Sequence, residues 1–409
     1  MKIGYLMQQG VNIRQRPFNG PANHVREVVH ELENLGHRVR VIVRLEGRTW
    51  VTDDLETFVP IRVRWLDQGP LRWFERLVRR IQSELKLPYA AFFESLRFAQ
   101  ACQQTLAGYD LLYERLSWMG YGGALASRWL KIPLILEDNG DQLADLESKG
   151  IAPQGLQRRL SIGVTGWAVR QATQIVSTGE GWRRQFIKRW GVPDTKVTTV
   201  ENGTTTIDLL KRENLRAFRG LKASEVTPTL VYLGGFYPWH GVPVLLRAFA
   251  QAQKFGKNMR LILIGSGIGE DEAHTLTSDL HLEDQVEFAG QLSPAEFTAV
   301  LADADIGLSP YCGWPEYSGL KIFDYKAAGL ACIASGEEGM PATISQGKTG
   351  WIVPPCDEEA LRVAILELAQ DLERTWQMGR VARLEAEQHH QWQHTAQTLE
   401  KIFLSINVI

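Results

Sequence analysis

The sequence predicts two doubly wound α/β domains in series, and three observations carry that prediction. Short apolar runs alternate with helical patterns along the whole chain of 409 residues. Most of these runs are continuous, which is typical of strands buried on both faces of a parallel sheet. The length suits two domains of roughly 150–200 residues better than a single core. We therefore expect Rossmann-like domains over residues 1–205 and 206–384, facing each other across a cleft.

Six strands are predicted in the first half. They cover residues 2–7, 38–43, 110–115, 132–137, 174–178 and 196–200. Between the first two, apolar residues recur at helical spacing over 21–35, with Pro21 at the start and Gly36 at the end. The stretch 204–228 is polar and lacks a strand pattern, so we expect the linker there.

The second half repeats the alternation. Its predicted strands cover residues 229–234, 260–265, 286–290, 305–310, 331–335 and 350–353. A helix is predicted from about Gly319 to Ala328, with Gly329 as its C-terminal stop. A last helical pattern covers 381–404, and we expect the C-terminal helix, about 385–409, to pack back onto the first domain.

Composition and charge limit the function classes. With 44% hydrophobic and 22% charged residues, the chain has the composition of a globular protein. Residues 1–205 carry 28 Lys and Arg against 21 Asp and Glu, whereas the remainder carries 17 against 26. A basic half therefore precedes an acidic one, which indicates an anionic partner for the first. A net charge of −2 argues against a nucleic-acid binder.

Cysteine spacing and hydropathy bear on the compartment. Cys102, Cys312, Cys332 and Cys356 form no CxxC pair, so we expect reduced thiols, no disulfide and a cytoplasmic location. The sequence has no run of about 18 apolar residues, and its first residues lack the apolar core of a signal peptide. We therefore expect no membrane-spanning segment.

The most informative segment is PEYSGLKIFDYKAAG, residues 315–329. Its first residues follow a predicted strand, at the strand end where open α/β sheets bind ligands. The helix that comes next begins with unpaired amides on Gly319, Leu320 and Lys321 and with the positive end of its dipole. A diphosphate would be stabilised there without a metal ion.

Two carboxylates flank this helix start. Glu316 precedes it, and Asp324 follows eight residues later, at most about 12 Å away along a helix that rises about 1.5 Å per residue. Carboxylates accept hydrogen bonds from vicinal hydroxyls, so one suits a sugar and the other a ribose. The spacing is equally compatible with a solvated helix residue at Asp324 and an ordinary cap partner at Glu316.

The same segment resembles the E-x7-E signature of retaining GT-B glycosyltransferases of family GT4, here as E-x7-D. The resemblance extends over nearly the whole chain, in the order that the family has. The matching motifs are GPANHVREVVHELENLGHRVRVI (20–42), ENGTT (201–205), GGFYPWHGVPVLLRAFA (234–250), IGSGIG (264–269), FAGQLS (288–293) and KTGWIVPPCD (348–357).

The resemblance implies a role for each matching residue. Glu316 would contact the transferred sugar at the reacting centre, and Asp324 would bind the ribose hydroxyls. Gly319 and Leu320 would meet the diphosphate, beside Gly235 of the donor-domain opening. The implied fold is GT-B, with an acceptor-binding first domain and a donor-binding second one, and the implied reaction retains the anomeric configuration.

This sequence departs from the family at the donor side. Asp324 is one methylene shorter than the usual Glu. Phe236 and His240 occupy places where the family usually has an Arg and a Lys that clamp the phosphates. A protonated His240 would be a weaker, pH-dependent donor to a phosphate, and the alternative is a packed loop residue. Lys321 starts from the helix mouth, so it is a candidate for the missing charge.

The first half holds one donor-binding candidate and three acceptor-binding ones. Gly20, the donor-binding candidate, stands in the loop after the first strand, where a glycine lets the backbone approach the donor phosphates or the acceptor across the cleft, although a plain turn before Pro21 is the alternative. Arg115, Asp138 and Asn139 end predicted strands on the expected cleft side. Each of these three is as compatible with a structural role as with acceptor binding.

The segment LRWFERLVRRI, residues 71–81, is a basic amphipathic helix. One face carries Leu71, Phe74, Leu77, Val78 and Ile81, and Arg72, Arg76, Arg79 and Arg80 surround it. With Trp73, this pattern fits a peripheral contact with an anionic membrane surface on its cytoplasmic side. The alternative is a domain-surface helix whose apolar stripe faces the core.

These observations favour a hexosyl transfer from a nucleotide-diphosphate sugar, of UDP or GDP type, to a hydroxyl of a carbohydrate or lipid-linked acceptor. We expect no cofactor and no metal ion, because no Asp-x-Asp or His cluster stands at a strand end. Two alternatives remain open: a nucleotide-sugar epimerase or phosphorylase on the same fold, and a catalytically silent sugar-nucleotide-binding module.

Overall fold

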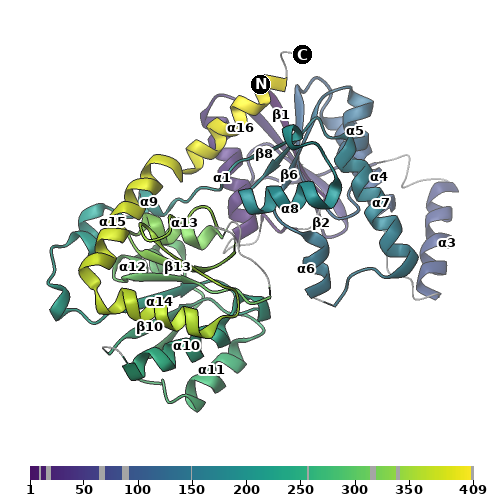
Figure 1. Ribbon diagram of the computed structural model, residues 1–409. Coiled ribbons are helices and arrows are strands. Elements are labelled where there is room, and N and C mark those ends of the chain that lie inside the picture. The colour runs from purple at the N-terminus through teal and green to yellow at the C-terminus, as the bar shows by residue number, and fades with distance from the viewer. Residues whose placement is uncertain are drawn as a thin grey trace. The chain divides into compact units, whose positions relative to one another are not determined.

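The computed structural model describes residues 1–8, 11–14, 20–63, 70–84, 92–148, 150–255, 258–313, 319–337 and 341–406. The chain separates into two compact units, each built around one sheet (Figure 1). Unit 1 comprises Met1–Thr178, Trp182–Val200 and Ala396–Ile409, and unit 2 comprises Gly179–Gly181 and Glu201–Thr395.

Unit 1 contains an eight-stranded sheet in the order β4-β3-β2-β1-β5-β6-β7-β8. The strands are β1 (Lys2–Met7), β2 (Arg38–Leu45), β3 (Arg48–Thr52), β4 (Val59–Pro60), β5 (Leu111–Arg115), β6 (Leu134–Asp138), β7 (Gln174–Ser177) and β8 (Val197–Thr199). Its helices are α1 (Gly20–Asn34), α3 (Pro70–Glu84), α4 (Phe92–Thr105), α5 (Gly122–Leu130), α6 (Gln142–Ser148), α7 (Gly155–Gln171) and α8 (Glu180–Trp190). All six strands predicted for this half are present, and they pair in parallel.

The sequence prediction missed the two antiparallel strands, β3 and β4, of which β4 forms the edge of the sheet. A two-residue turn joins β2 to β3, and both of its residues, Glu46 and Gly47, have positive φ. That geometry matches the twist of a tight hairpin. The strands escape a search for continuous apolar runs because β3 begins and ends with polar residues and β4 is only two residues long.

Unit 2 contains a six-stranded parallel sheet in the order β11-β10-β9-β12-β13-β14. The strands are β9 (Thr229–Leu233), β10 (Arg260–Ile264), β11 (Val286–Gly290), β12 (Ile306–Ser309), β13 (Ala331–Ser335) and β14 (Gly350–Val353). Its helices are α9 (Thr206–Leu209), α10 (Val242–Phe255), α11 (Glu270–Asp279), α12 (Pro294–Ala302), α13 (Leu320–Ala327), α14 (Glu358–Gln370) and α15 (Leu372–His389). All six predicted strands are present, and the region 204–228 holds no strand.

The cores agree with strands buried on both faces. In unit 2, side chains of β9, β10 and β12 pack against Leu245, Phe249 and Ile365 of the covering helices. In unit 1, β5, β6 and β7 pack against Phe98 and Val169 in the same way. The central strands of both sheets therefore have no solvent-exposed face, which explains the continuous apolar runs of the sequence.

The end of the chain differs from the prediction of one helix over 381–404. α15 ends at His389, and α16 (Trp392–Ile406) begins three residues later. The break is held by His390, whose carbonyl accepts the Thr204 amide and whose ring contacts Lys326. Beyond the break, Phe403 packs on Tyr113 of β5 with 5.5 Å between ring centroids.

The expectation of four free thiols is wrong. Cys312 and Cys356 form a disulfide with 4.6 Å between their Cα atoms, whereas Cys102 and Cys332 are buried and free. Cys312 follows β12, and Cys356 precedes α14, so the bond joins two loops of unit 2 that lie 44 residues apart in sequence. Spacing along the chain could not reveal this pair, because the fold alone brings the two loops together.

Candidate functional site

The donor-side candidate lies where the strand order of unit 2 reverses. β9 has β10 on one side and β12 on the other, so the loops after β9 and after β12 leave the sheet in opposite directions. Ligands of open α/β sheets bind in the crevice at such a point, outside the carboxyl ends of the strands. The segment 234–250 singled out from the sequence begins there, directly after β9, and the described part of the segment 315–329, residues 319–329, follows β12 along the chain.

Two glycine loops approach each other closely at this edge. A Cβ on Gly265, whose φ is +130°, would lie 1.9 Å from the carbonyl oxygen of Gly234. A Cβ on Gly234, whose φ is +155°, would lie 3.2 Å from Nζ of Lys321. Only glycine combines this backbone conformation with such close approach, so the loops after β9 and β10 pack without side chains.

Lys321 brings a cation to this edge from the first turn of α13. Its Nζ lies 3.3 Å from the hydroxyl oxygen of Tyr311. It also lies over two rings, 5.0 Å from the centroid of Tyr232 and 4.8 Å from that of Tyr311. Most of the side chain is buried, so packing and cation–π contacts fix the position of the ammonium group beside Gly234.

His240 does not act as the predicted cationic donor. Burial and the nearby charge of Lys321 lower the pKa of His240, whereas a hydrogen bond with the Gly235 carbonyl raises it. The resulting pKa is about 3. The ring is therefore neutral at neutral pH. Its Nδ1 contacts the Gly235 carbonyl and the Tyr232 hydroxyl, which identifies a packed loop residue.

Phe236, like His240, has a structural role in the loop after β9. Its side chain is fully buried, and its ring contacts those of Tyr232 and Phe288 at centroid distances of 6.0 and 6.3 Å. Its backbone holds the loop that follows β10, donating to the Ser266 carbonyl and accepting from Gly269. Neither of the family's usual clamp positions supplies a positive charge here.

α13 begins at the place that the sequence predicts. Gly319 is the N-cap residue and Leu320 the first helical residue, and the Ile322 amide donates to the Gly319 carbonyl at 3.0 Å. The backbone N–H groups of a first helical turn point toward the helix start, where the positive end of the dipole lies. Gly319 contributes no capping side chain. Glu316, the predicted sugar-binding carboxylate, lies outside the described residues.

Asp324 lies one turn further along α13. Its Oδ1 accepts hydrogen bonds from the hydroxyls of Thr204, at 2.5 Å, and Thr206, at 2.8 Å. Burial raises the pKa of Asp324 to about 6, although both threonine hydrogen bonds lower it. This carboxylate is held by Thr204 of the ENGTT segment and by Thr206 just after it rather than solvated, so the interpretation as a solvated helix residue does not apply.

In unit 1, Arg115 and Asn139 belong to a buried charge cluster. Both contact Glu137: Arg115 through NH1 at 3.5 Å, and Asn139 through its side-chain amide. Nε2 of His24 lies 2.8 Å from the same carboxylate. Burial raises the pKa of Glu137, but His24 and Arg115 outweigh it and hold that pKa well below its usual range. These contacts give Arg115 and Asn139 a structural role, since both hold the buried carboxylate of Glu137.

Gly20 is the exposed first residue of α1.

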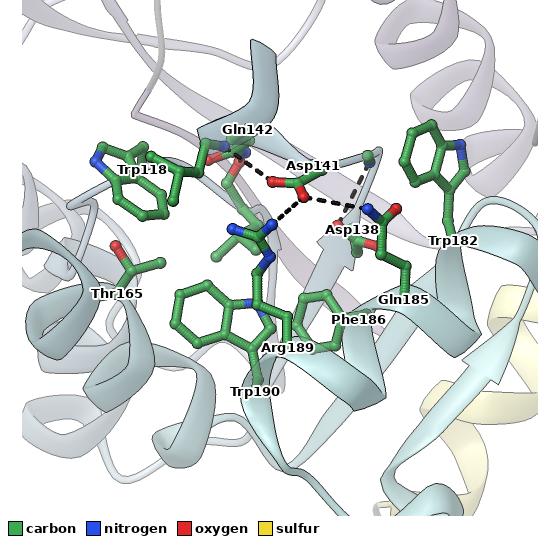
Figure 2. Close-up of a pocket in the computed structure, with 13 residues that line it drawn as sticks. Trp118, Asp138, Asp141, Gln142, Thr165, Trp182, Gln185, Phe186, Arg189 and Trp190 are labelled. Carbon is green, nitrogen blue, oxygen red and sulfur yellow. Dashed lines mark hydrogen bonds and ion pairs between the residues drawn. The ribbon is translucent and has the colours of Figure 1, made fainter. Parts of the chain in front are cut away.

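Asp138 opens instead into a pocket between the loops after β5 and β6 and helix α8 (Figure 2). Burial raises the pKa of Asp138 to about 8, so this carboxyl is largely protonated at neutral pH. Next to it, Asp141 accepts from Gln185 at 3.2 Å and pairs with Arg189. The indoles of Trp118, Trp182 and Trp190 surround these groups.

Three buried polar atoms of this lining have no hydrogen-bond partner among the residues that the structure describes: Nε1 of Trp118, Oε1 of Gln142 and Oε1 of Gln185. The pocket has a volume of about 20 Å³, which admits one water-sized group. A hydroxyl fits this space, and the surrounding aromatic rings suit contact with a sugar ring. Within the described ranges, no group of three or more His, Cys, Asp or Glu side chains is placed to hold a metal ion.

Comparison with known proteins decides the family. Residues 19–203 match the family model described as glycosyl transferase 4-like domain, and residues 227–371 match the one described as glycosyl transferases group 1. Together the two models match most of the chain. The chain belongs to the group 1 glycosyltransferases.

Relatives of this glycosyltransferase span both units. A D-inositol 3-phosphate glycosyltransferase of Corynebacterium aurimucosum is 25% identical over 414 aligned positions, covering 95% of this chain and 92% of that protein. A GDP-mannose-dependent phosphatidylinositol monomannoside mannosyltransferase of Mycolicibacterium smegmatis is 28% identical over 170 positions, 40% of this chain and 44% of that one.

Solved structures confirm the GT-B fold. Anabaena HepE in complex with UDP is 18% identical, with a TM-score of 0.71 and coverage of 99% of this chain and 100% of that one. Sucrose-phosphate synthase from Thermosynechococcus elongatus is 19% identical, with the same TM-score and 98% coverage of each chain.

The glycosyltransferase thus has two candidate regions, one in each unit. The structure brings Gly235, His240 and Lys321 together at one sheet edge, with Gly319 at the start of the helix that carries Lys321. Sequence reasoning missed the pocket residues Trp118, Asp141, Gln142, Trp182, Gln185, Arg189 and Trp190. The high count of 13 tryptophans was the available signal, but it does not indicate which rings converge.

Proposed function

We propose that this chain transfers a hexosyl group from a nucleoside-diphosphate sugar to a hydroxyl of a carbohydrate or lipid-linked acceptor, with retention of anomeric configuration. The observation that carries the donor side is the start of α13 at the switch point of the unit 2 sheet, with Lys321 beside it. Amides at a helix start and a nearby ammonium group both favour an anion.

In this proposal the diphosphate lies against the amides of Gly319 and Leu320 and against the Gly234–Gly235 loop. Lys321 supplies the positive charge that Phe236 and His240 lack. The leaving diphosphate gains negative charge as the glycosidic bond breaks, so donors fixed in advance lower the barrier. The protein's contribution is electrostatic and positional, and no side chain is assigned as a covalent nucleophile.

The two carboxylates complete the donor site. Asp324 would use its remaining oxygen, Oδ2, to accept from a ribose hydroxyl while Oδ1 stays with Thr204 and Thr206. Glu316 would contact the transferred sugar, as the resemblance implies. The printed names of similar proteins support a nucleotide-sugar donor, since one structure holds UDP and one relative depends on GDP-mannose. They do not choose between the two bases.

For the acceptor side we propose the tryptophan-rimmed pocket of unit 1. A hydroxyl that entered it would meet the protonated Asp138 and the unpartnered atoms of Trp118, Gln142 and Gln185. The indole faces would contact the apolar face of the sugar ring. Similar proteins named for inositol phosphate and phosphatidylinositol acceptors support a polyhydroxylated acceptor that carries phosphate.

No cofactor, metal ion or nucleic acid takes part in the proposed reaction. Among the described residues, no helix is both long and apolar enough to cross a bilayer. We propose that the enzyme works in the cytoplasm and contacts the anionic surface of the membrane peripherally through α3.

The test uses Glu316→Gln and Asp324→Asn. A thermal-shift panel with UDP, GDP and ADP first identifies the base, because a ligand that binds only the native state raises the melting temperature. Transfer from the matching labelled sugar nucleotide should then fall at least a hundredfold in Glu316→Gln while the fold is retained. Full activity in both variants refutes the site. Isomerised donor without transfer identifies an epimerase, phosphorolysis identifies a phosphorylase, and tight binding without turnover identifies a silent module.

A further inference from the structure

α3 exposes apolar side chains and buries a charged one, which is the reverse of an ordinary surface helix. Its large apolar side chains face solvent: Trp73 is 64% exposed, Phe74 50%, Leu77 39% and Ile81 48%. The spacing of Trp73, Leu77 and Ile81 places them on one face. By contrast, Glu75 points inward and is only 5% exposed. The alternative of a stripe that faces the core is therefore wrong for Phe74, Leu77 and Ile81. The helix that carries them, α3, lies at the outer edge of unit 1 (Figure 1).

Beside α3 lies a hollow of about 760 Å³, bordered by β3, β4, α3 and α4. We call it the arginine hollow, because six arginines line it: Arg44, Arg48, Arg62, Arg76, Arg79 and Arg97. Its described lining contains only two acidic residues, Glu75 and Glu94. Six positive charges against two leave the described lining with an excess of four.

The inner arginines are fixed by those two glutamates. Nε of Arg79 lies 2.8 Å from Oε1 of Glu75, and NH1 of Arg97 lies 2.9 Å from the same atom. Arg79 also reaches Glu94 at 2.6 Å, and Arg44 lies 3.5 Å from it. The pKa of Arg44 is lowered overall. Burial is the largest cause of this lower pKa, the charge of Glu94 opposes it, and the repulsion from Arg79 and Arg97 adds to it. A bound anion would offset that repulsion.

We propose that α3 and the arginine hollow form a docking site for the phosphate-bearing headgroups of an anionic phospholipid bilayer. The apolar stripe of α3 enters the interface, and phosphate groups enter the hollow. Exposed arginines at its rim, Arg48, Arg62 and Arg76, meet the surface first. A phospholipid surface satisfies both features at once, since it offers acyl chains and phosphates within a few ångströms of each other. The inference deepens the membrane contact of the proposed function and rests on it, but not on glycosyl transfer.

The experiment is sedimentation of the full-length protein with phosphatidylcholine vesicles, with and without phosphatidic acid. Wild type should bind the vesicles with phosphatidic acid and release them at high salt, because screening weakens exposed charge contacts. Arg48→Gln/Arg62→Gln should bind at least tenfold more weakly, since each arginine near an anionic surface contributes roughly a fivefold factor. The matched control, Arg128→Gln/Lys131→Gln, removes two exposed charges at the end of α5 and should bind as wild type does.

The apolar stripe is tested separately. Trp73→Ser/Ile81→Ser should weaken vesicle binding about tenfold or more, whereas Trp129→Ser on α5 should not. Equal binding of wild type to both vesicle types, or equal binding by the two double arginine variants, overturns the headgroup site. A stripe variant that converts a dimer to a monomer, with no vesicle binding by wild type, assigns α3 to a second copy of the chain and also overturns it. Nucleotide binding in the thermal-shift panel should be unchanged in every variant, which separates failure here from failure of the proposed function.

Discussion

Asp324 gives the sharpest consequence of the donor-side geometry, because its carboxylate is held in a site that disfavours its charge. The ordinary pKa is 3.8, and burial raises it to about 6 despite the hydrogen bonds from Thr204 and Thr206. The difference corresponds to about 3 kcal/mol by which ionised Asp324 destabilises the folded protein relative to the protonated form. Asn has the shape of the protonated acid and keeps an oxygen for both threonine hydroxyls.

Asp324→Asn should therefore stabilise unit 2 while it weakens nucleotide binding. The folded pKa is raised, so the penalty is absent below about pH 4, develops as the pH rises from 4 to 6, and is complete above 6. The variant should match wild type in free energy of unfolding at pH 4 and exceed it by about 3 kcal/mol at pH 7. For a unit of this size, that is a rise in melting temperature of about 6–12 °C.

Affinity for a nucleoside diphosphate should fall tenfold to a hundredfold, because a charge-assisted hydrogen bond to the ribose is replaced by a weaker one. Urea unfolding across this pH range and isothermal titration calorimetry measure the two effects. Asp279→Asn is the matched control, since it makes the same change on an exposed helical residue of unit 2. A variant that is less stable than wild type at pH 7, or that binds nucleotide equally well, refutes the reasoning.

Three further predictions concern unit 2. Lys321→Met should weaken nucleoside diphosphate binding at least tenfold. It should also raise the pKa of His240 above about 3, because the charge of Lys321 is one of the two effects that lower this pKa, beside burial. An unchanged titration of His240 by NMR contradicts this prediction. Cys312→Ser/Cys356→Ser should lower the free energy of unfolding by about 2–4 kcal/mol, and a reductant should have the same effect on wild type but none on the variant. Gly265→Ala should cost about 3 kcal/mol or more and weaken nucleotide binding, because its Cβ would lie 1.9 Å from the Gly234 carbonyl. Gly290→Ala, with open space around its Cβ, should cost only about 1–2 kcal/mol, and equal costs for the two would contradict the argument.

The sequence was sufficient for the elements whose signal is local. Continuous apolar runs located all twelve parallel strands, and the glycine after α13 marked its end. β3 has no such signal, because polar residues surround its apolar ones, and β4 is too short to give one. The break after α15 was missed because it depends on contacts of His390 with Lys326 and Thr204, which are far away in sequence.

The candidate site was predictable only where a motif carried it. The helix start, Asp324 and Lys321 follow from one segment, and the structure adds that His240 is neutral and that Asp324 is bound by two threonines. The pocket of unit 1 draws on the ends of successive strands and on α8, so no single stretch of sequence reveals it. The disulfide was missed for the same reason.

A crystal structure of the full-length protein with the nucleoside diphosphate chosen by the thermal-shift panel tests the central claim most directly. The account predicts phosphate oxygens within about 3 Å of the amides of Gly319 or Leu320, which is hydrogen-bonding distance, and Nζ of Lys321 beside them. A nucleotide bound elsewhere, with the start of α13 unoccupied, would contradict it.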